Sequence, residues 1–111
     1  MQPKTIGRIK DIIEACENIQ KCCVGMNEET LEKDVIKFAA TIRFLEIIGE
    51  ASKNIPEDIR IKHSKIPWKK MAGLRDILIH AYNNVDPEAV WKIATESVPT
   101  IKNELLKIIT G

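Results

Sequence analysis

Helical periodicity runs through most of the chain and limits its fold more than any other feature. Apolar residues recur at intervals of three and four, which is typical of one face of an amphipathic α-helix. No segment shows the strict alternation expected of a half-buried strand. With 111 residues, 44% of them hydrophobic, the chain is long enough to bury one core without disulfides or metals. The sequence therefore predicts an all-α protein.

The first two helices have clear boundary signals. Residues 4–21 carry one apolar face, and Gly25 ends that helix; the face consists of Ile6, Ile9, Ile12, Ile13, Cys16 and Ile19. Asn27 suits an N-cap, and the two glutamates that follow it oppose the helix dipole. A second helix is predicted from residue 28 to about residue 53, with a buried face of Leu31, Val35, Phe38, Ile42, Leu45, Ile48 and Ala51.

Prolines divide the remainder of the chain. Residues 57–66, between Pro56 and Pro67, suggest one short helix. Pro67 suits the start of a helix over residues 68–82, which the pair Asn83-Asn84 breaks. That helix buries Met71, Leu74, Leu78 and Ala81 by spacing, and Trp68 is expected to pack in the core.

Asp86-Pro87 opens the last helix, and Pro99 is expected to kink or split it. The predicted fold is an up-and-down bundle of four long helices plus a short one, forming a single domain over residues 1–111.

Charge is sorted along a nearly neutral chain, whose net charge is +1. Between Ile59 and Arg75 there are six basic residues and no acidic one, whereas residues 28–34 hold four acids and one lysine. One interpretation is an ordinary solvated surface; the other is a face that binds phosphates. The candidates for RNA backbone contacts are Lys62, Lys65, Lys69 and Lys70.

The three cysteines, Cys16, Cys22 and Cys23, form a poor disulfide framework and favour a reducing compartment. No Cys or His spacing suggests a zinc site, so neither a metal nor another cofactor is expected. No apolar run approaches the roughly 20 residues of a membrane span. We therefore expect a cytoplasmic protein that does not enter a membrane.

The string R-D-I-L-I-H-A-Y, residues 75–82, combines groups suited to phosphate chemistry. Asp76 and His80 are four residues apart, so on a helix the carboxylate can orient the imidazole and raise its pKa. Arg75 and His80 lie about 140° apart around an ideal helix. They would meet at one small ligand only through a distorted helix end or a second copy of the chain.

Metal-free RNA cleavage needs two proton transfers and stabilisation of charge on the phosphorus. Histidine suits the proton transfers, and the guanidinium fork of arginine suits the phosphate. The one histidine of this string is too few for both an acid and a base, but a symmetric dimer supplies two copies of it. The alternative is a structural histidine beside an Arg–Asp surface pair.

The pattern R-x-x-x-x-H-x-Y late in a small all-α chain resembles the HEPN superfamily, specifically the HepT-like toxins of HepT/MntA toxin–antitoxin pairs. The strings IRFLEIIGEASKNIP (residues 42–56) and IPWKKMAGLRDILIHAYNNVD (residues 66–86) are similar to the family core in wording and order. The later pairs Val90-Trp91 and Val98-Pro99 also fit. The resemblance covers residues from about 28 to 105.

This resemblance implies a homodimeric, metal-independent endoribonuclease with Arg75 and His80 as the catalytic pair. Asp76 occupies the polar position after the arginine, where it can orient His80 or weaken RNA binding. Tyr82 matches the tyrosine that the partner nucleotidyltransferase antitoxin adenylylates. Added AMP would block the cleft and repel RNA. The alternative function is a non-catalytic module that docks a nucleotidyltransferase or a nucleotide.

Two glycines are given a packing role. Gly49 and Gly73 are expected to permit close approach of a neighbouring helix rather than to form a phosphate loop, because both lie within helical patterns.

Overall fold

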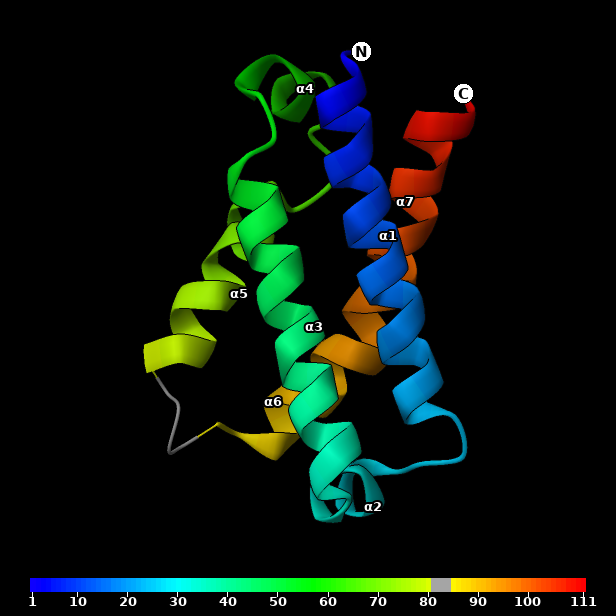
Figure 1. The fold of residues 1–111 in the computed structure, drawn as a ribbon, viewed down its shortest axis with the longest axis vertical. Helices are drawn as coiled ribbons and strands as arrows, with labels where there is room; N and C mark the ends of the chain where they lie inside the picture. The colour runs from blue at the N-terminus through cyan, green and yellow to red at the C-terminus, as the bar shows by residue number, and fades with distance from the viewer. Residues whose placement is uncertain (81–84) are drawn as a thin grey trace.

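Helices are the only regular secondary structure in the described part of the chain. The computed structural model describes residues 1–80 and 85–111, apart from the side chains of Arg75, Ile77, Ile79 and His80. In chain order the elements are α1 (Pro3–Cys23), α2 (Glu28–Lys33), α3 (Val35–Lys53), α4 (Glu57–Lys62), α5 (Trp68–His80), α6 (Pro87–Lys92), the π-helical segment η1 (Ile93–Ser97) and α7 (Val98–Thr110). Successive long segments run in opposite directions (Figure 1). The predicted all-α, up-and-down arrangement is confirmed for these residues.

α1 begins and ends where the sequence indicates. Pro3 stands in its first turn, where its missing N–H costs no hydrogen bond. Gly25, with φ of 71°, lies in the left-handed region just beyond the last turn. The chain can therefore reverse there and enter α2.

The prediction of one helix over residues 28–53 is wrong, because Asp34 divides it. The Asp34 backbone is extended, with φ of −82° and ψ of 92°, and its side chain accepts a hydrogen bond from the Lys37 N–H at 3.0 Å. Asn27 and Thr30 form a reciprocal capping box that makes α2 a separate short helix. The described residues thus contain the short helix α2 in addition to the short helix predicted after Pro56.

The break at Asp34 also changes which side chains are buried. Val35 and Ile36 are 77% and 81% exposed, although spacing predicted an inward Val35. Farther along α3 the predicted face is recovered, with Leu45 and Ile48 fully buried.

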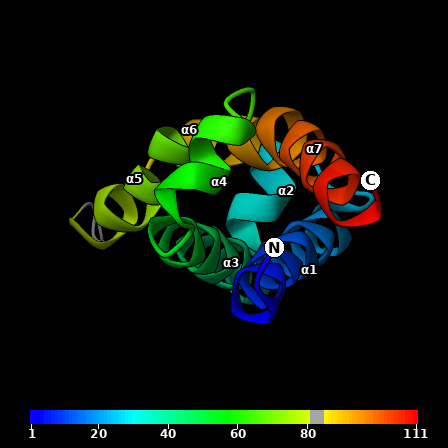
Figure 2. The same cartoon turned by 90° about the horizontal axis from the view of Figure 1, so that it is seen from above.

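The core lies between α1, α3 and the last helices. α1 packs against α3 and α7, and α3 packs against α5. Seen from above, α5 lies at one edge of the bundle, beside α3 and away from α1 and α7 (Figure 2). The core side chains of these elements include Ile9, Ile12, Cys16, Leu45, Ile48, Met71, Val98 and Leu105. The arrangement leaves the helix that carries the candidate catalytic residues on the outside.

The last helical rod passes through Pro99 without ending. The Val98 N–H donates to the Ile93 carbonyl, five residues earlier, which defines the π-helical turn of η1. A proline ring collides with the carbonyl four residues before it in a regular α-helix. The predicted irregularity is therefore present as a widened turn ahead of Pro99, with α6 and α7 continuing on either side.

Two α3 substitutions test this description of the core. Leu45→Ala should lower the free energy of unfolding by about 2–5 kcal/mol, because it deletes a fully buried side chain and leaves a cavity. Val35→Ala, at an exposed position on the same helix, should change it by less than about 0.5 kcal/mol. Urea unfolding followed by circular dichroism measures both, and equal losses would contradict the assignment of faces.

The cysteines are free thiols with different surroundings. Cys16 is buried, and Cys22 and Cys23 are half-buried. Burial raises the pKa of Cys16 to about 12 and also raises the pKa of Cys23. The Cys16 thiol therefore stays protonated and unreactive at neutral pH.

Thiol labelling of the native chain follows from these surroundings. An aromatic disulfide reagent at pH 8 should modify Cys22 first, Cys23 more slowly and Cys16 only after unfolding. Because the pKa of Cys16 is raised in the folded state, this thiol favours folding below about pH 9, and that contribution falls as the pH rises toward 12. Peptide mass spectrometry identifies the labelled residues; rapid labelling of Cys16 in native buffer would contradict its burial.

Two expected absences concern membranes and metals. Among residues 1–80 and 85–111, no helix is long and apolar enough to cross a membrane. Within the same described ranges, no group of three His, Cys, Asp or Glu side chains is arranged to hold a metal ion.

Candidate functional site

The start of α5 is fixed by contacts with the preceding loop. Trp68 is 5% exposed, and its Nε1–H donates to the His63 carbonyl at 3.0 Å. The Ile66 N–H donates to the same carbonyl at 3.1 Å. The predicted packing role of Trp68 is confirmed. These contacts fix where α5 begins. They therefore also fix how far along the bundle Arg75 and His80 lie.

Arg75 and His80 lie in the second half of α5, which ends at His80. Their backbone positions share one helix, as predicted, and remain five residues apart, so an ideal helix separates their directions by about 140°. Tyr82 and the predicted break at Asn83-Asn84 lie outside the described residues. The assignment of these groups therefore depends on sequence and on the position of α5 at the edge of the bundle.

Asp76 makes a contact that the sequence did not reveal. Its Oδ1 accepts a hydrogen bond from Lys53 Nζ at 2.8 Å, and the two side chains are 53% and 39% exposed. Lys53 is the last residue of α3, so this ion pair joins the end of α3 to the motif helix. The partners are separated by 23 positions in the sequence, which explains why no local pattern indicated the contact.

The four candidate RNA-binding lysines are exposed, and they line two different depressions. Lys62 and Lys65 line a hollow of about 340 Å³ between the α4–α5 connection and α7. Lys69 and Lys70 lie on the first turn of α5 and line a different groove, of about 510 Å³, against η1 and α7. The basic stretch is thus divided between two neighbouring depressions.

The second depression, here called the apolar groove, is built mainly from apolar side chains. Its lining consists of Pro67, Lys69, Lys70, Met71, Gly73, Leu74, Ile93, Ser97 and Ile101. A Cβ at Gly73 would meet nothing within 4 Å. The prediction that Gly73 permits close helix approach is therefore wrong, because this position borders the open groove.

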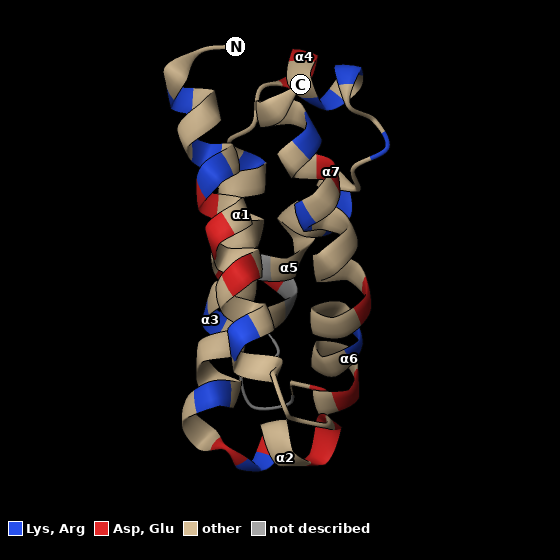
Figure 3. Cartoon of the chain, turned by 90° about the vertical axis from the view of Figure 1, so that its right-hand side faces the viewer, with Lys and Arg blue, Asp and Glu red and all other residues tan. Residues whose placement is uncertain are grey.

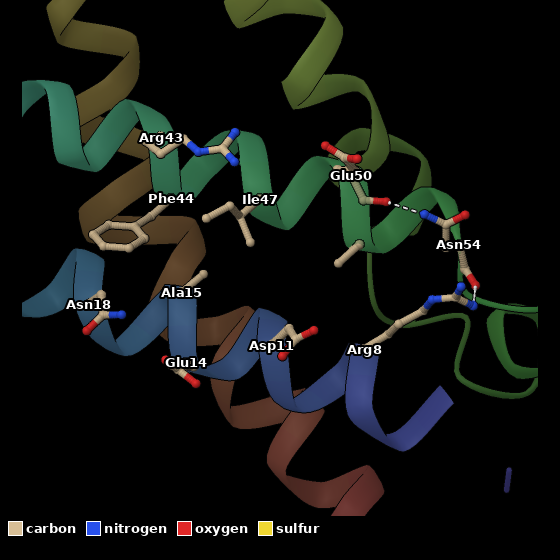
Figure 4. A pocket seen from close by; sticks show the side chains of 11 residues that line it. Arg8, Asp11, Glu14, Ala15, Asn18, Arg43, Phe44, Ile47, Glu50 and Asn54 are labelled. Carbon is tan, nitrogen blue, oxygen red and sulfur yellow. Dashed lines mark hydrogen bonds between the residues drawn. The ribbon is translucent and has the colours of Figure 1, made fainter. Parts of the chain in front are cut away.

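A third depression, of about 470 Å³, lies between α1 and α3 (Figure 4). Arg8 Nη1–H donates to the Asn54 carbonyl at 2.9 Å and so closes the C-terminal end of α3. Its charged described side chains are three carboxylates, Asp11, Glu14 and Glu50, and two arginines, Arg8 and Arg43. Because carboxylates outnumber cations here, this depression suits a phosphate less well than the one lined by Lys62 and Lys65.

Comparisons with known proteins place the chain in a family. The profile of the HepT-like family, described as "Ribonuclease HepT-like", matches residues 12–108. The chain is 45% identical over 100 residues to the "Probable ribonuclease HepT" of Thermococcus cleftensis, covering 90% of this chain and 91% of that protein. It is 47% identical over 100 residues to the "Putative RNase MJ1216" of Methanocaldococcus jannaschii, covering 89% and 82%. No solved structure matches significantly.

The chain therefore belongs to the HepT-like ribonuclease family. The match includes α5 and the residues before and after it, so it covers the whole R-x-x-x-x-H-x-Y string. The resemblance drawn from residues 28–105 is confirmed, and with it the assignment to a family of enzymes that act on RNA.

Proposed function

We propose that the chain is a metal-independent endoribonuclease toxin in which Arg75 and His80 act on the RNA phosphodiester. The observation that carries this proposal is the R-x-x-x-x-H-x-Y string of a chain from the HepT-like ribonuclease family, with Arg75 and His80 on an edge helix. His80 removes the proton from the ribose 2′-hydroxyl or protonates the leaving 5′-oxygen. Arg75 stabilises the charge that develops on the phosphate.

The active unit in this proposal is a homodimer. Two chains related by a two-fold axis supply two histidines and two arginines to one cleft. Two features support this assembly: α5 lies at the edge of the bundle, and the apolar groove beside it leaves Leu74 partly exposed. A second copy packed along α5 would cover this apolar surface and bring the two motifs together.

The proposed regulator is a nucleotidyltransferase antitoxin that attaches AMP to Tyr82. Tyr82 follows His80 by two residues, so an added phosphate would stand close to the imidazole. The negative charge and bulk of AMP would repel and block the RNA backbone.

The test is cleavage of single-stranded RNA by the purified chain in the presence of excess chelator. A metal-free attack by the 2′-hydroxyl leaves 2′,3′-cyclic phosphate or 3′-phosphate ends and a free 5′-hydroxyl. Mass spectrometry of the fragments identifies these ends. If the chain cleaved no RNA but still bound the nucleotidyltransferase antitoxin, the alternative of a non-catalytic docking module would be favoured.

Dimerisation is tested separately with Leu74→Glu, which places a charge in the apolar groove. Sedimentation velocity should show the original chain as a dimer and this variant as a monomer. Ile36→Glu, at an 81% exposed position on α3, is the control and should leave the dimer intact. A dimer that survives Leu74→Glu would place the interface elsewhere.

A further inference from the structure

The depression beside the α4–α5 connection, here called the basic hollow, has a lining suited to anions. Its polar described residues are Lys62, His63, Ser64, Lys65, Glu104 and Lys107. Lys107 Nζ pairs with Glu104 Oε1 at 3.1 Å, which offsets the one carboxylate in this lining. Lys62 and Lys65 pair with no carboxylate among the residues that the structure describes.

The backbone that carries these groups is held in place. Two N–H groups, from Ile66 and the Trp68 indole, donate to the His63 carbonyl. Ile66 and Trp68 are themselves only 4% and 5% exposed. The segment between Lys62 and Lys65 is therefore anchored to the core by the residues that follow it, and it presents its charges from a fixed loop.

The charge of the hollow stays positive after the helix dipoles are included. α4 and α7 both end near it, and a helix C-terminus carries about half a negative elementary charge. The two unpaired lysines exceed this contribution. Figure 3 shows Lys and Arg along the α4–α5 connection and near the end of α7, at the opposite end of the bundle from α2.

The motif lies farther along α5 than the hollow does. α5 begins just after the hollow and rises by about 1.5 Å per residue, so Trp68 and His80 are about 18 Å apart along the helix axis. A stacked strand advances by about 3.4 Å per nucleotide, so about five nucleotides cover this length. One strand can therefore reach both places.

We propose that the basic hollow binds a backbone phosphate of the RNA substrate about five nucleotides from the bond that is cut. This inference rests on the proposed ribonuclease function and adds a second contact point to it. Phosphate contacts position a strand without reading its sequence. The enzyme then prefers substrates that extend past the cleavage site far enough to fill the hollow.

The test uses DNA strands that contain one ribonucleotide, because only that position has the 2′-hydroxyl needed for cleavage. Strands with two or with eight deoxynucleotides on each side of it are compared by kcat/KM. The original chain should cleave the long strand at least about tenfold better. Replacing the outer phosphates with neutral methylphosphonates should remove this advantage, since the contact is ionic.

Variants of the hollow identify the residues responsible. Lys62→Gln with Lys65→Gln should reduce the ratio of kcat/KM between long and short strands. The salt slope of binding should fall by about 0.7, the value for one phosphate contact on a single strand. Lys62→Arg with Lys65→Arg should keep the ratio. Glu104→Gln should raise it, because a negative charge leaves the lining. The control, Lys10→Gln with Lys33→Gln, removes equal charge from exposed positions elsewhere.

An unchanged ratio in the Lys62→Gln, Lys65→Gln chain would overturn the proposal. So would binding of inorganic phosphate or AMP in the hollow without any preference for long strands. If the original chain cut neither these strands nor single-stranded RNA, the ribonuclease proposal would fail instead. The hollow would then be tested by fluorescence anisotropy, where the same two lysines should account for tighter binding of the long phosphodiester strand than of its methylphosphonate counterpart.

Discussion

Replacing His80 with alanine is expected to lower the rate of RNA cleavage by about 10²- to 10⁴-fold, the usual contribution of a positioned acid or base. Arg75→Ala should cost about 10²- to 10³-fold by removing charge stabilisation at the phosphate. Single-turnover cleavage of a labelled RNA measures the rates of both variants. Circular dichroism of each variant checks that the helical fold is retained.

Arg43→Ala is the matched control for Arg75. Arg43 is exposed on α3 and pairs with Glu46 at 3.4 Å, a surface ion pair of little energetic value. Its loss should leave cleavage nearly unchanged. If both the Arg75→Ala and His80→Ala chains cut RNA at the original rate, the catalytic assignment would be wrong.

Mixed dimers test whether the cleft is shared. A dimer of one original chain and one chain that carries both Arg75→Ala and His80→Ala retains one complete arginine–histidine pair, on a single subunit. If the cleft needs both histidines, this mixed dimer should lose far more than half of the original cleavage rate. Retention of about half of that rate would indicate that each chain works with its own pair.

Tyr82→Phe is expected to abolish silencing while leaving toxicity intact. The hydroxyl that would accept AMP is removed, but the ring is retained. Cells that express the original chain with its nucleotidyltransferase should grow, and cells with the variant should arrest. Mass spectrometry should find AMP on the original chain and none on the variant.

The modified residue can be assigned without ambiguity because Tyr82 is the only tyrosine in the sequence. Any AMP-tyrosine peptide therefore identifies the site directly. A nucleotidyltransferase mutated in its own catalytic residues, co-expressed with the original chain, is the control for silencing by binding alone. Rescue of the Tyr82→Phe chain by the active antitoxin would contradict silencing through this hydroxyl.

Sequence reasoning located most helix boundaries because local groups determine them. Gly25, the Asn27 cap and the Asp86-Pro87 start all lie where the pattern indicated. It failed at Asp34, since apolar spacing continued through the break and a single aspartate decided the outcome. An Asp inside a helical pattern can act as an N-cap, and only packing shows whether it does.

The site was less predictable than the fold. The residues of the motif were recognisable because they lie close together in the sequence, whereas partners joined by tertiary packing were not. Lys53 reaches Asp76 from another helix, and Lys107 joins Lys62 and Lys65 from the far end of the chain. Neither partner has a local signal, because helix packing decides which distant residues become neighbours.

The extra residue in the π-helical turn at residues 93–97 is what allows a proline to stand at position 99 inside a continuous helical rod. Deleting one exposed residue there, such as Glu96, would narrow the turn and direct the ring of Pro99 against a carbonyl. Pro99→Ala should rescue such a deletion while changing little by itself. The loss of one residue from η1 is therefore tolerated only when residue 99 is not a proline. Homologues that lack the extra residue are expected to lack this proline as well.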